Sequence, residues 1–287
     1  MVQYLLTGVT GGLGAHVLEY FLAHVDPSTY AVASSNPAKA SKFTAKGLAF
    51  RAVNYDDPST LATAFEEVEN LFFVSSNTFD NERRRRQHQD VVDAAKRAGV
   101  KHVRTRLYTE AFPLYFNWYP TTQTIVLPQP TPSTTPSETP ANTQRITFTS
   151  REELGHATAR LLLRGGGNFR NQIVVLSARE TLSFRQIVDL INQHHHDGKE
   201  GVRIEFVPPA EYVARNAAAD EGGKPAGFFE AMVSWHEGIA KGEAVVDGDG
   251  LMAEVLGREP TRASERIREL LSEARAEGGY TWHQNYA

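Results

Sequence analysis

The chain reads Leu6-Thr7-Gly8-Val9-Thr10-Gly11-Gly12-Leu13-Gly14, in which three glycines have the spacing GxxGxxG. Residues 3–7 before this turn predict a buried strand, and the helical spacing of apolar residues in 14–25 predicts a helix. In such a unit, glycines let the backbone approach a pyrophosphate, which the free N–H groups of the helix then bind. A tight structural turn is the alternative. We expect a dinucleotide to bind at Gly8, Thr10, Gly11, Gly12, Leu13 and Gly14.

Strand-like and helix-like segments alternate along the first hundred residues. Strands are predicted at residues 30–33, 48–53, 71–75 and 101–103, and helices at 37–46, 58–68 and 82–98. This alternation indicates βαβ units and a parallel sheet. The predicted fold is α/β, a Rossmann-like doubly wound parallel sheet with a smaller, partly helical C-terminal substrate region. We expect an NAD(P)-binding region at 1–126, a Pro/Thr-rich loop at 127–144 and a substrate-binding region at 145–287.

Bulk properties exclude several classes of protein. The net charge of -4 argues against broad nucleic-acid binding. No apolar run approaches the roughly 20 residues that span a bilayer, and the N-terminus has no signal-peptide pattern. The absence of cysteine excludes disulfides and thiol nucleophiles. We expect a cytoplasmic monomer or homodimer that acts on a small molecule, with no nucleic-acid or membrane partner.

The segment after the second predicted strand bears on the choice of cofactor. Enzymes that prefer NAD usually carry an acidic residue there, about 20 residues beyond the glycine turn. This chain has no acid at residues 33–39. Small polar groups and a lysine suit a 2′-phosphate, so the sequence favours NADP(H) over NAD(H), with helix capping as the alternative role. The residues concerned are Ser34, Ser35, Asn36 and Lys39.

Three further groups of residues are candidates for a site. Ser75, Ser76 and Asn77 follow the fourth predicted strand, where doubly wound sheets bind ligands, although a strand-ending turn is equally compatible. The histidines at 194–196 point in different directions on a helix, so we predict a helix-capping role and no metal site. An aromatic set either lines a substrate pocket or packs in a core, and its members are Tyr108, Phe112, Tyr115 and Trp118.

Several stretches together resemble one family. They are residues 7–14, 36–40, 54–57, 73–76, 87–103, 107–112, 148–155, 230–243 and 280–286. As a set they resemble the NmrA-like family of atypical short-chain dehydrogenases, which includes fungal oxidoreductases and bacterial NADPH quinone oxidoreductases of the second type. The resemblance implies a Rossmann-type fold, adds Asn54 and Tyr55 to the expected cofactor-binding residues, and implies NAD(P)H-dependent reduction of a quinone or of an intermediate of fungal secondary metabolism.

The chain departs from this family in one place. In the family, about forty residues, a length typical of a βαβ crossover, separate the counterparts of residues 101–103 and 107–108. They include a lysine often found beside the nicotinamide, and no catalytic residue is assigned here. An alternative splice form, a gene-model error or a degenerate copy would each explain the gap. We predict a short fifth strand and loose packing across residues 104–142. A non-catalytic dinucleotide sensor and an inactive truncated form are the alternative functions.

Overall fold

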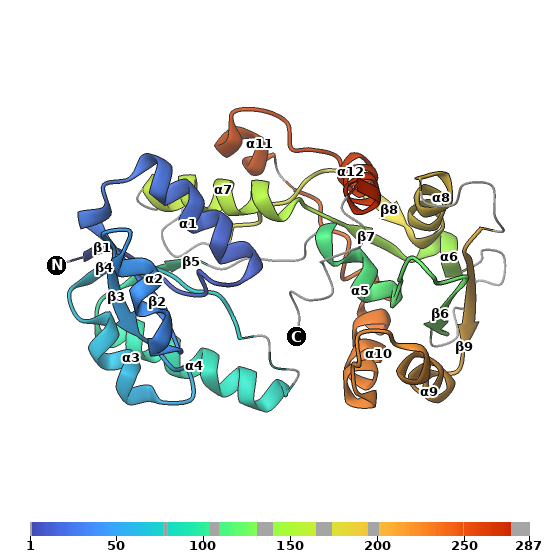
Figure 1. Cartoon of the computed structure of the whole chain (residues 1–287), viewed down its shortest axis with the longest axis horizontal. Helices are drawn as coiled ribbons and strands as arrows, with labels where there is room; N and C mark the ends of the chain where they lie inside the picture. The colour runs from blue at the N-terminus through green and yellow to red at the C-terminus, as the bar shows by residue number, and fades with distance from the viewer. Residues whose placement is uncertain are drawn as a thin grey trace. The chain divides into compact units, whose positions relative to one another are not determined.

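The computed structural model of the protein describes residues 2–76, 78, 80–103, 109–130, 140–164, 174–194, 201–248 and 250–276. Contacts divide the chain into two compact units (Figure 1). Unit 1 comprises Met1–Arg106 and Arg151–Leu176, and unit 2 comprises Leu107–Ser150 and Ser177–Ala287. The sequence-based division has boundaries after residues 126 and 144. The contacts divide the chain elsewhere because a later segment returns to unit 1.

Unit 1 contains a five-stranded parallel sheet with the order β3-β2-β1-β4-β5. Its strands are β1 (Val2–Leu6), β2 (Tyr30–Ser34), β3 (Ala49–Ala52), β4 (Val68–Phe72) and β5 (Lys101–Val103). Strand order reverses at β1, the switch point beside which doubly wound sheets bind ligands. The predicted Rossmann-like sheet is therefore confirmed, including its short fifth strand.

Helices cover both faces of this sheet, as Figure 1 shows. On one face, Phe21 of α1 packs edge-on against Tyr4 at 5.4 Å and Tyr30 at 5.2 Å. On the other face, buried Leu61 and Val91 belong to the cluster around Leu5, Ala31 and Leu71. The helices and 3-10 turns of unit 1 are α1 (Gly12–His24), η1 (Pro27–Thr29), η2 (Pro37–Lys39), α2 (Ala40–Thr44), α3 (Pro58–Phe65), α4 (Asn81–Arg97) and α7 (Arg151–Leu163).

Helix α7 reaches unit 1 from a distant part of the sequence and packs along α1 (Figure 1). Close approach of the two helices depends on Gly155, because a Cβ there would lie 2.5 Å from the Cβ of His16. The sequence predicts this helix, since Ser150 and Glu153 form a capping-box pattern. It does not indicate which unit the helix joins.

Unit 2 is built from short strands and several helices around one apolar core. Parallel β6 (Thr124–Pro128) pairs with β9 (Arg203–Val207), and antiparallel β7 (Arg145–Thr147) pairs with β8 (Thr181–Ser183). Its helices and one 3-10 turn are η3 (Thr109–Ala111), α5 (Phe112–Phe116), α6 (Pro140–Thr143), α8 (Phe184–His194), α9 (Pro209–Ala219), α10 (Ala226–Ala240), α11 (Leu251–Leu256) and α12 (Ala263–Ala276).

Two sequence-based predictions are wrong within the described residues. Loose packing was expected across residues 104–142, but Ile125 and Leu127 of β6 are fully buried because they contribute to the core of unit 2. The apolar run Ile173-Val174-Val175-Leu176 also predicts a strand, but residues 174–176 have no regular secondary structure. Residue 173 lies outside the described ranges. Of the helices in those ranges, none combines the length and apolar character that a bilayer-spanning helix needs.

Candidate functional site

The turn after β1 is shaped by two glycines. Gly8 has φ of 66°, a left-handed conformation, and a Cβ there would lie 2.8 Å from the Cβ of Val74. A Cβ at Gly14 would lie 2.2 Å from the carbonyl oxygen of Gly8. Glycine at both positions lets the turn fold back on α1 and lie against the chain that follows β4. The turn therefore sits at the switch point of the sheet.

The start of α1 has the properties of an anion site. Gly11 occupies the N-cap position in an extended conformation, and neither a side-chain cap nor an acidic residue is present in the described first turn of this helix. The first N–H groups of a helix have no acceptor within it, and the helix dipole makes this end positive. Gly11 is exposed, and among the described residues a Cβ there would meet only the Gly8 carbonyl oxygen, at 3.4 Å. A phosphate group can therefore approach this backbone.

Lys39 is brought to the glycine turn by the end of β2. Its Nζ donates a hydrogen bond to Oγ1 of Thr10 at 3.3 Å, across 29 residues of sequence. Asn36 has the helix-capping role that the sequence left open, because its side chain accepts from the N–H of Ala38 at 3.0 Å. Ser34 Oγ accepts from the N–H of Asn36 at 3.3 Å, and Ser35 is exposed. A cation and small polar groups thus surround the position where an acid would select NAD.

Tyr55 joins the ends of three strands. Its hydroxyl oxygen lies 2.8 Å from Thr7 Oγ1 and 3.1 Å from the Val74 carbonyl oxygen. The N–H of Val74 donates to Thr7 Oγ1 at 3.2 Å. Burial raises the pKa of Tyr55 to about 12, while its bond to Thr7 opposes that shift. The hydroxyl is therefore a neutral structural link at ordinary pH, and its place beneath the site suits a positioning role.

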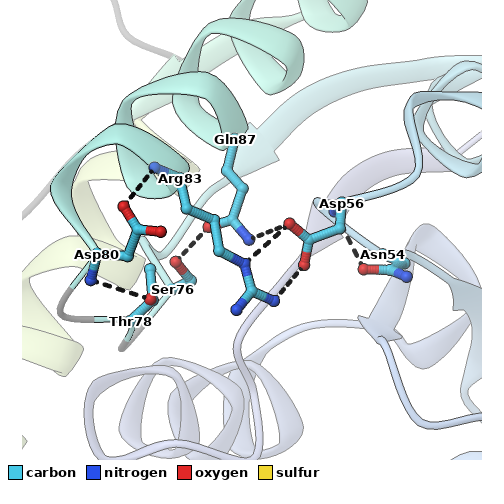
Figure 2. A network of polar contacts seen from close by, with 7 residues as sticks. All are labelled: Asn54, Asp56, Ser76, Thr78, Asp80, Arg83 and Gln87. Atoms are coloured by element: carbon cyan, nitrogen blue, oxygen red, sulfur yellow. Dashed lines mark hydrogen bonds and ion pairs between the residues drawn. The ribbon is translucent and has the colours of Figure 1, made fainter.

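A polar network borders the same edge of the sheet (Figure 2). The carboxylate of Asp56 accepts from Nε and Nη2 of Arg83 at 3.0 and 2.6 Å and from Nε2 of Gln87 at 3.0 Å. The bonds from Arg83 hold the pKa of Asp56 below its usual range. Ser76 Oγ donates to Oε1 of Gln87, so the network links β4 to α4, while Oδ1 of Asn54 accepts from the N–H of Asp56 at 3.1 Å.

Sequence reasoning missed the residues at the centre of this network. Arg83 belongs to the basic run at 83–86, and its partner Asp56 is 27 residues away in the sequence. The only signal was the position of Asp56 after a predicted strand, which does not identify a partner. Ser76 and Asn54 were expected to bind cofactor, and in the structure both side chains make hydrogen bonds within the protein.

Ser75 lies beside a histidine at the end of β4. Its Oγ is 2.7 Å from Nε2 of His88, whose ring packs edge-on against Phe73 at 5.2 Å. Ser75 is exposed and His88 is half-buried. This pair provides a hydroxyl and an imidazole at the carboxyl edge of the parallel sheet. Asn77, which was predicted to act with Ser75, lies outside the described residues.

The aromatic set belongs to unit 2. Phe112, Tyr115 and Trp118 are 0%, 5% and 1% exposed and lie in its apolar core. Their burial favours core packing, the alternative that the sequence left open. Tyr115 also packs at 5.6 Å against Trp235, which is 39% exposed. Tyr108 lies outside the described residues.

Comparison with known proteins places these features in a wider group. Residues 3–104 match the NmrA-like family. The whole chain is 39% identical, over 327 residues and 99% of the relative, to the NmrA-like family domain-containing oxidoreductase flvB of Aspergillus flavus. It is also 39% identical over 98 residues, 34% of each chain, to quinone oxidoreductase 2 of Escherichia coli. The structure of Citrobacter triphenylmethane reductase complexed with NADP(H) has a TM-score of 0.74 at 23% identity, covering 93% of this chain and 99% of that one.

The alignment with the Aspergillus protein is longer than this chain. It spans 327 residues, about forty more than the 287 of the chain, as expected if one βαβ crossover were missing. The family match ends at residue 104, next to the expected position of the gap.

Proposed function

The chain belongs to the NmrA-like family, and from that premise we propose that it is an NADP(H)-dependent oxidoreductase that reduces a small organic molecule in the cytoplasm. Unit 1 would bind the dinucleotide across the turn after β1 and the ends of β2 and β4. The pyrophosphate would lie at the start of α1, where the backbone is open at Gly11 and the helix end is positive.

The contact between Lys39 and Thr10 is the main observation that supports the proposed preference for NADP(H). It places an ammonium group beside the phosphate-binding turn and next to exposed Ser35. An ammonium group attracts the 2′-phosphate of NADP(H), and nothing at residues 34–39 would repel it, because no acid is present there. The crystallised Citrobacter neighbour holds NADP(H), which supports the same choice.

We place the substrate in a class rather than name it. The Escherichia coli relative is a quinone oxidoreductase, and the Aspergillus relative is an oxidoreductase, so a quinone or an unsaturated secondary-metabolite intermediate fits the group. The bound cofactor supplies the hydride, and the protein orients it and excludes water.

Cofactor consumption tests the proposal. Purified protein is mixed with NADPH and a panel of quinones, and absorbance at the wavelength of the reduced nicotinamide is followed, with NADH in parallel. Faster oxidation of NADPH than of NADH, dependent on a quinone, is the expected result. NADPH binding without turnover by any acceptor would instead support the sensor or the inactive form, and absence of binding would overturn the proposal.

A single substitution sharpens this test. Ser35→Asp places a carboxylate where the 2′-phosphate is expected, so affinity for NADPH should fall and that for NADH should rise or stay level. Ser41→Asp, on the adjacent exposed part of α2, is the matched control for added charge. Equal effects of both substitutions on NADPH affinity would remove the argument for a 2′-phosphate at Ser35.

A further inference from the structure

A buried arginine from the returning helix lies on the phosphate-binding turn. Arg151 is the first residue of α7 and only 7% exposed. A Cβ built on Gly12 would lie 2.6 Å from its Nη1 and 2.8 Å from its Cζ. The guanidinium thus occupies the space that a side chain at Gly12 would take, over the first residue of α1. The sequence provides this space because position 12 is a glycine.

The electrostatics of this contact favour an anion. The first residue of α1 is at the positive end of that helix, where a cation is ordinarily disfavoured. An anion that reaches the exposed turn at Gly11 would be attracted by the helix end and by Arg151 together. Guanidinium also suits phosphate oxygens because it donates several hydrogen bonds from one plane.

We propose that Arg151 binds the pyrophosphate of the dinucleotide, as a ligand-binding residue contributed by α7 to the turn after β1. This inference rests on the proposed function, because it needs a dinucleotide at that turn. It also gives the returning segment a role: residues from Arg151 onward would complete a site whose other parts lie in the first hundred residues.

The competing explanation is that Arg151 only fastens α7 to α1. Arg160 provides a matched control, because it lies on the same helix and its guanidinium sits 5.5 Å from the ring of Tyr20 in α1. Both arginines join the same two helices, and only Arg151 touches the glycine turn. A fastening role predicts similar consequences for the two, whereas phosphate binding predicts a difference in ligand affinity.

The test measures the dissociation constants of three ligands by calorimetry on the full chain. NADPH and 2′-phospho-ADP-ribose contain the pyrophosphate, and 2′-AMP lacks it. Arg151→Met should weaken the first two by about tenfold to a hundredfold, the usual contribution of a charged hydrogen bond, and change 2′-AMP binding by less than about twofold. Arg160→Met should leave all three unchanged. The melting temperature without ligand reports on folding.

A second variant, Gly12→Ala, disrupts the contact between Gly12 and Arg151 by changing the glycine. Gly12→Ala would push the flexible end of the Arg151 side chain away, and alanine favours the helix over glycine. We expect stability to hold and NADPH affinity to fall, with little further loss when Gly12→Ala is added to Arg151→Met. If Arg151→Met does not fold, an unchanged NADPH affinity of Gly12→Ala alone still overturns the role of Arg151.

The outcomes separate this inference from the proposed function. If the parent chain binds no NADPH, the proposed function fails. If the parent binds NADPH, and Arg151→Met and Gly12→Ala bind it equally well, the proposed function stands and the role of Arg151 is overturned. Equal losses from Arg151→Met and Arg160→Met would also overturn it, in favour of helix fastening.

Discussion

The hydroxyl of Tyr55 lies 2.8 Å from Oγ1 of Thr7, although the two residues are 48 positions apart in the sequence. Thr7 directly follows β1, and Tyr55 follows β3, which is separated from β1 by β2 in the sheet. The same hydroxyl lies 3.1 Å from the carbonyl oxygen of Val74 after β4. One buried phenol therefore fixes the spacing of three strand ends, and with it the floor of the proposed cofactor site.

Removal of this hydroxyl should destabilise the protein. Tyr55→Phe leaves the Thr7 and Val74 groups without this partner, and we expect a loss of about 1–3 kcal/mol in the free energy of unfolding at pH 8. Urea denaturation measures it, with Tyr20→Phe on α1 as the control. A loss no greater than that of the control would show that the link contributes little.

The parent and Tyr55→Phe should also differ in how their stability depends on alkaline pH. Burial raises the pKa of Tyr55 to about 12, so its neutral form stabilises the fold fully below pH 10 and less as the pH rises through 12. Tyr55→Phe cannot lose that contribution. The stability difference between parent and variant should therefore narrow between pH 10 and 12, and a constant difference would contradict the shift.

Gly14 should tolerate no side chain. A Cβ there would lie 2.2 Å from the carbonyl oxygen of Gly8, and backbone atoms cannot move aside as a flexible side chain can. We expect Gly14→Ala to lower the free energy of unfolding by about 3 kcal/mol or more. Gly47→Ala is the control, because Gly47 has φ of 75° and a Cβ there would have no atom of the described residues within 4 Å, so only about 1 kcal/mol of backbone strain is expected. Equal losses would contradict the packing argument.

Most of unit 1 could be predicted because its determinants are local. Short apolar runs separated by amphipathic segments indicate a parallel sheet, and the glycine turn locates the switch point. The packing of α7 on α1 depends on the fit between Gly155 and His16, which are distant in the sequence. Arg151 was missed for the same reason, since its contact with Gly12 exists only after that packing.

Unit 2 was harder to predict because its strands are short and because the burial of its side chains, more than any local sequence pattern, determines its structure. β6 carries a weak alternating pattern and lies next to a Pro/Thr-rich stretch, so the whole region resembled a loop. Ile125 and Leu127 nevertheless pack into a core rich in aromatic rings. The sequence singled out an aromatic set, of which Phe112, Tyr115 and Trp118 lie in this core, but its composition alone suited a pocket and a core equally.

A low pH should reduce the free energy of unfolding because the buried His236 becomes protonated. This histidine is buried between the rings of Phe184 and Tyr212, each at 5.8 Å, and its Nε2 donates to the Tyr115 carbonyl oxygen at 3.0 Å. Burial lowers its pKa to about 4, an effect that the bond to Tyr115 partly opposes. Its neutral form therefore stabilises the fold above pH 6.5, and this contribution is lost as the pH falls through 4.

His236→Gln isolates this effect, because glutamine keeps an N–H donor and does not titrate. Between pH 7 and 4 the parent should lose on the order of 3 kcal/mol more unfolding free energy than the variant. Urea denaturation at a series of pH values measures the two slopes. If the free energy of unfolding falls equally with pH in parent and variant, protonation of His236 does not cause the loss of stability in acid.

The length difference from the Aspergillus flavus relative leads to a prediction about activity. In the variant that tests it, the relative's additional residues, about forty and comparable in length to one βαβ crossover, are inserted into this chain after Val103. We expect this variant to reduce quinones with NADPH faster and to be more soluble, because β5, which within the described residues pairs only with β4, would gain a second neighbouring strand. If the chain as it stands reduces quinones equally fast, the crossover is dispensable.

The most direct measurement is the affinity of the folded chain for NADPH before and after Gly11→Val. Gly11 is exposed, and the fold itself leaves room for a Cβ there, so the variant should fold, with its branched side chain in the space proposed for the pyrophosphate. Calorimetry should show that the parent binds NADPH tightly and NADH more weakly. Gly11→Val should show no measurable NADPH binding, and its melting temperature should equal that of the parent. Equal NADPH affinity of parent and variant would contradict a dinucleotide site at this turn.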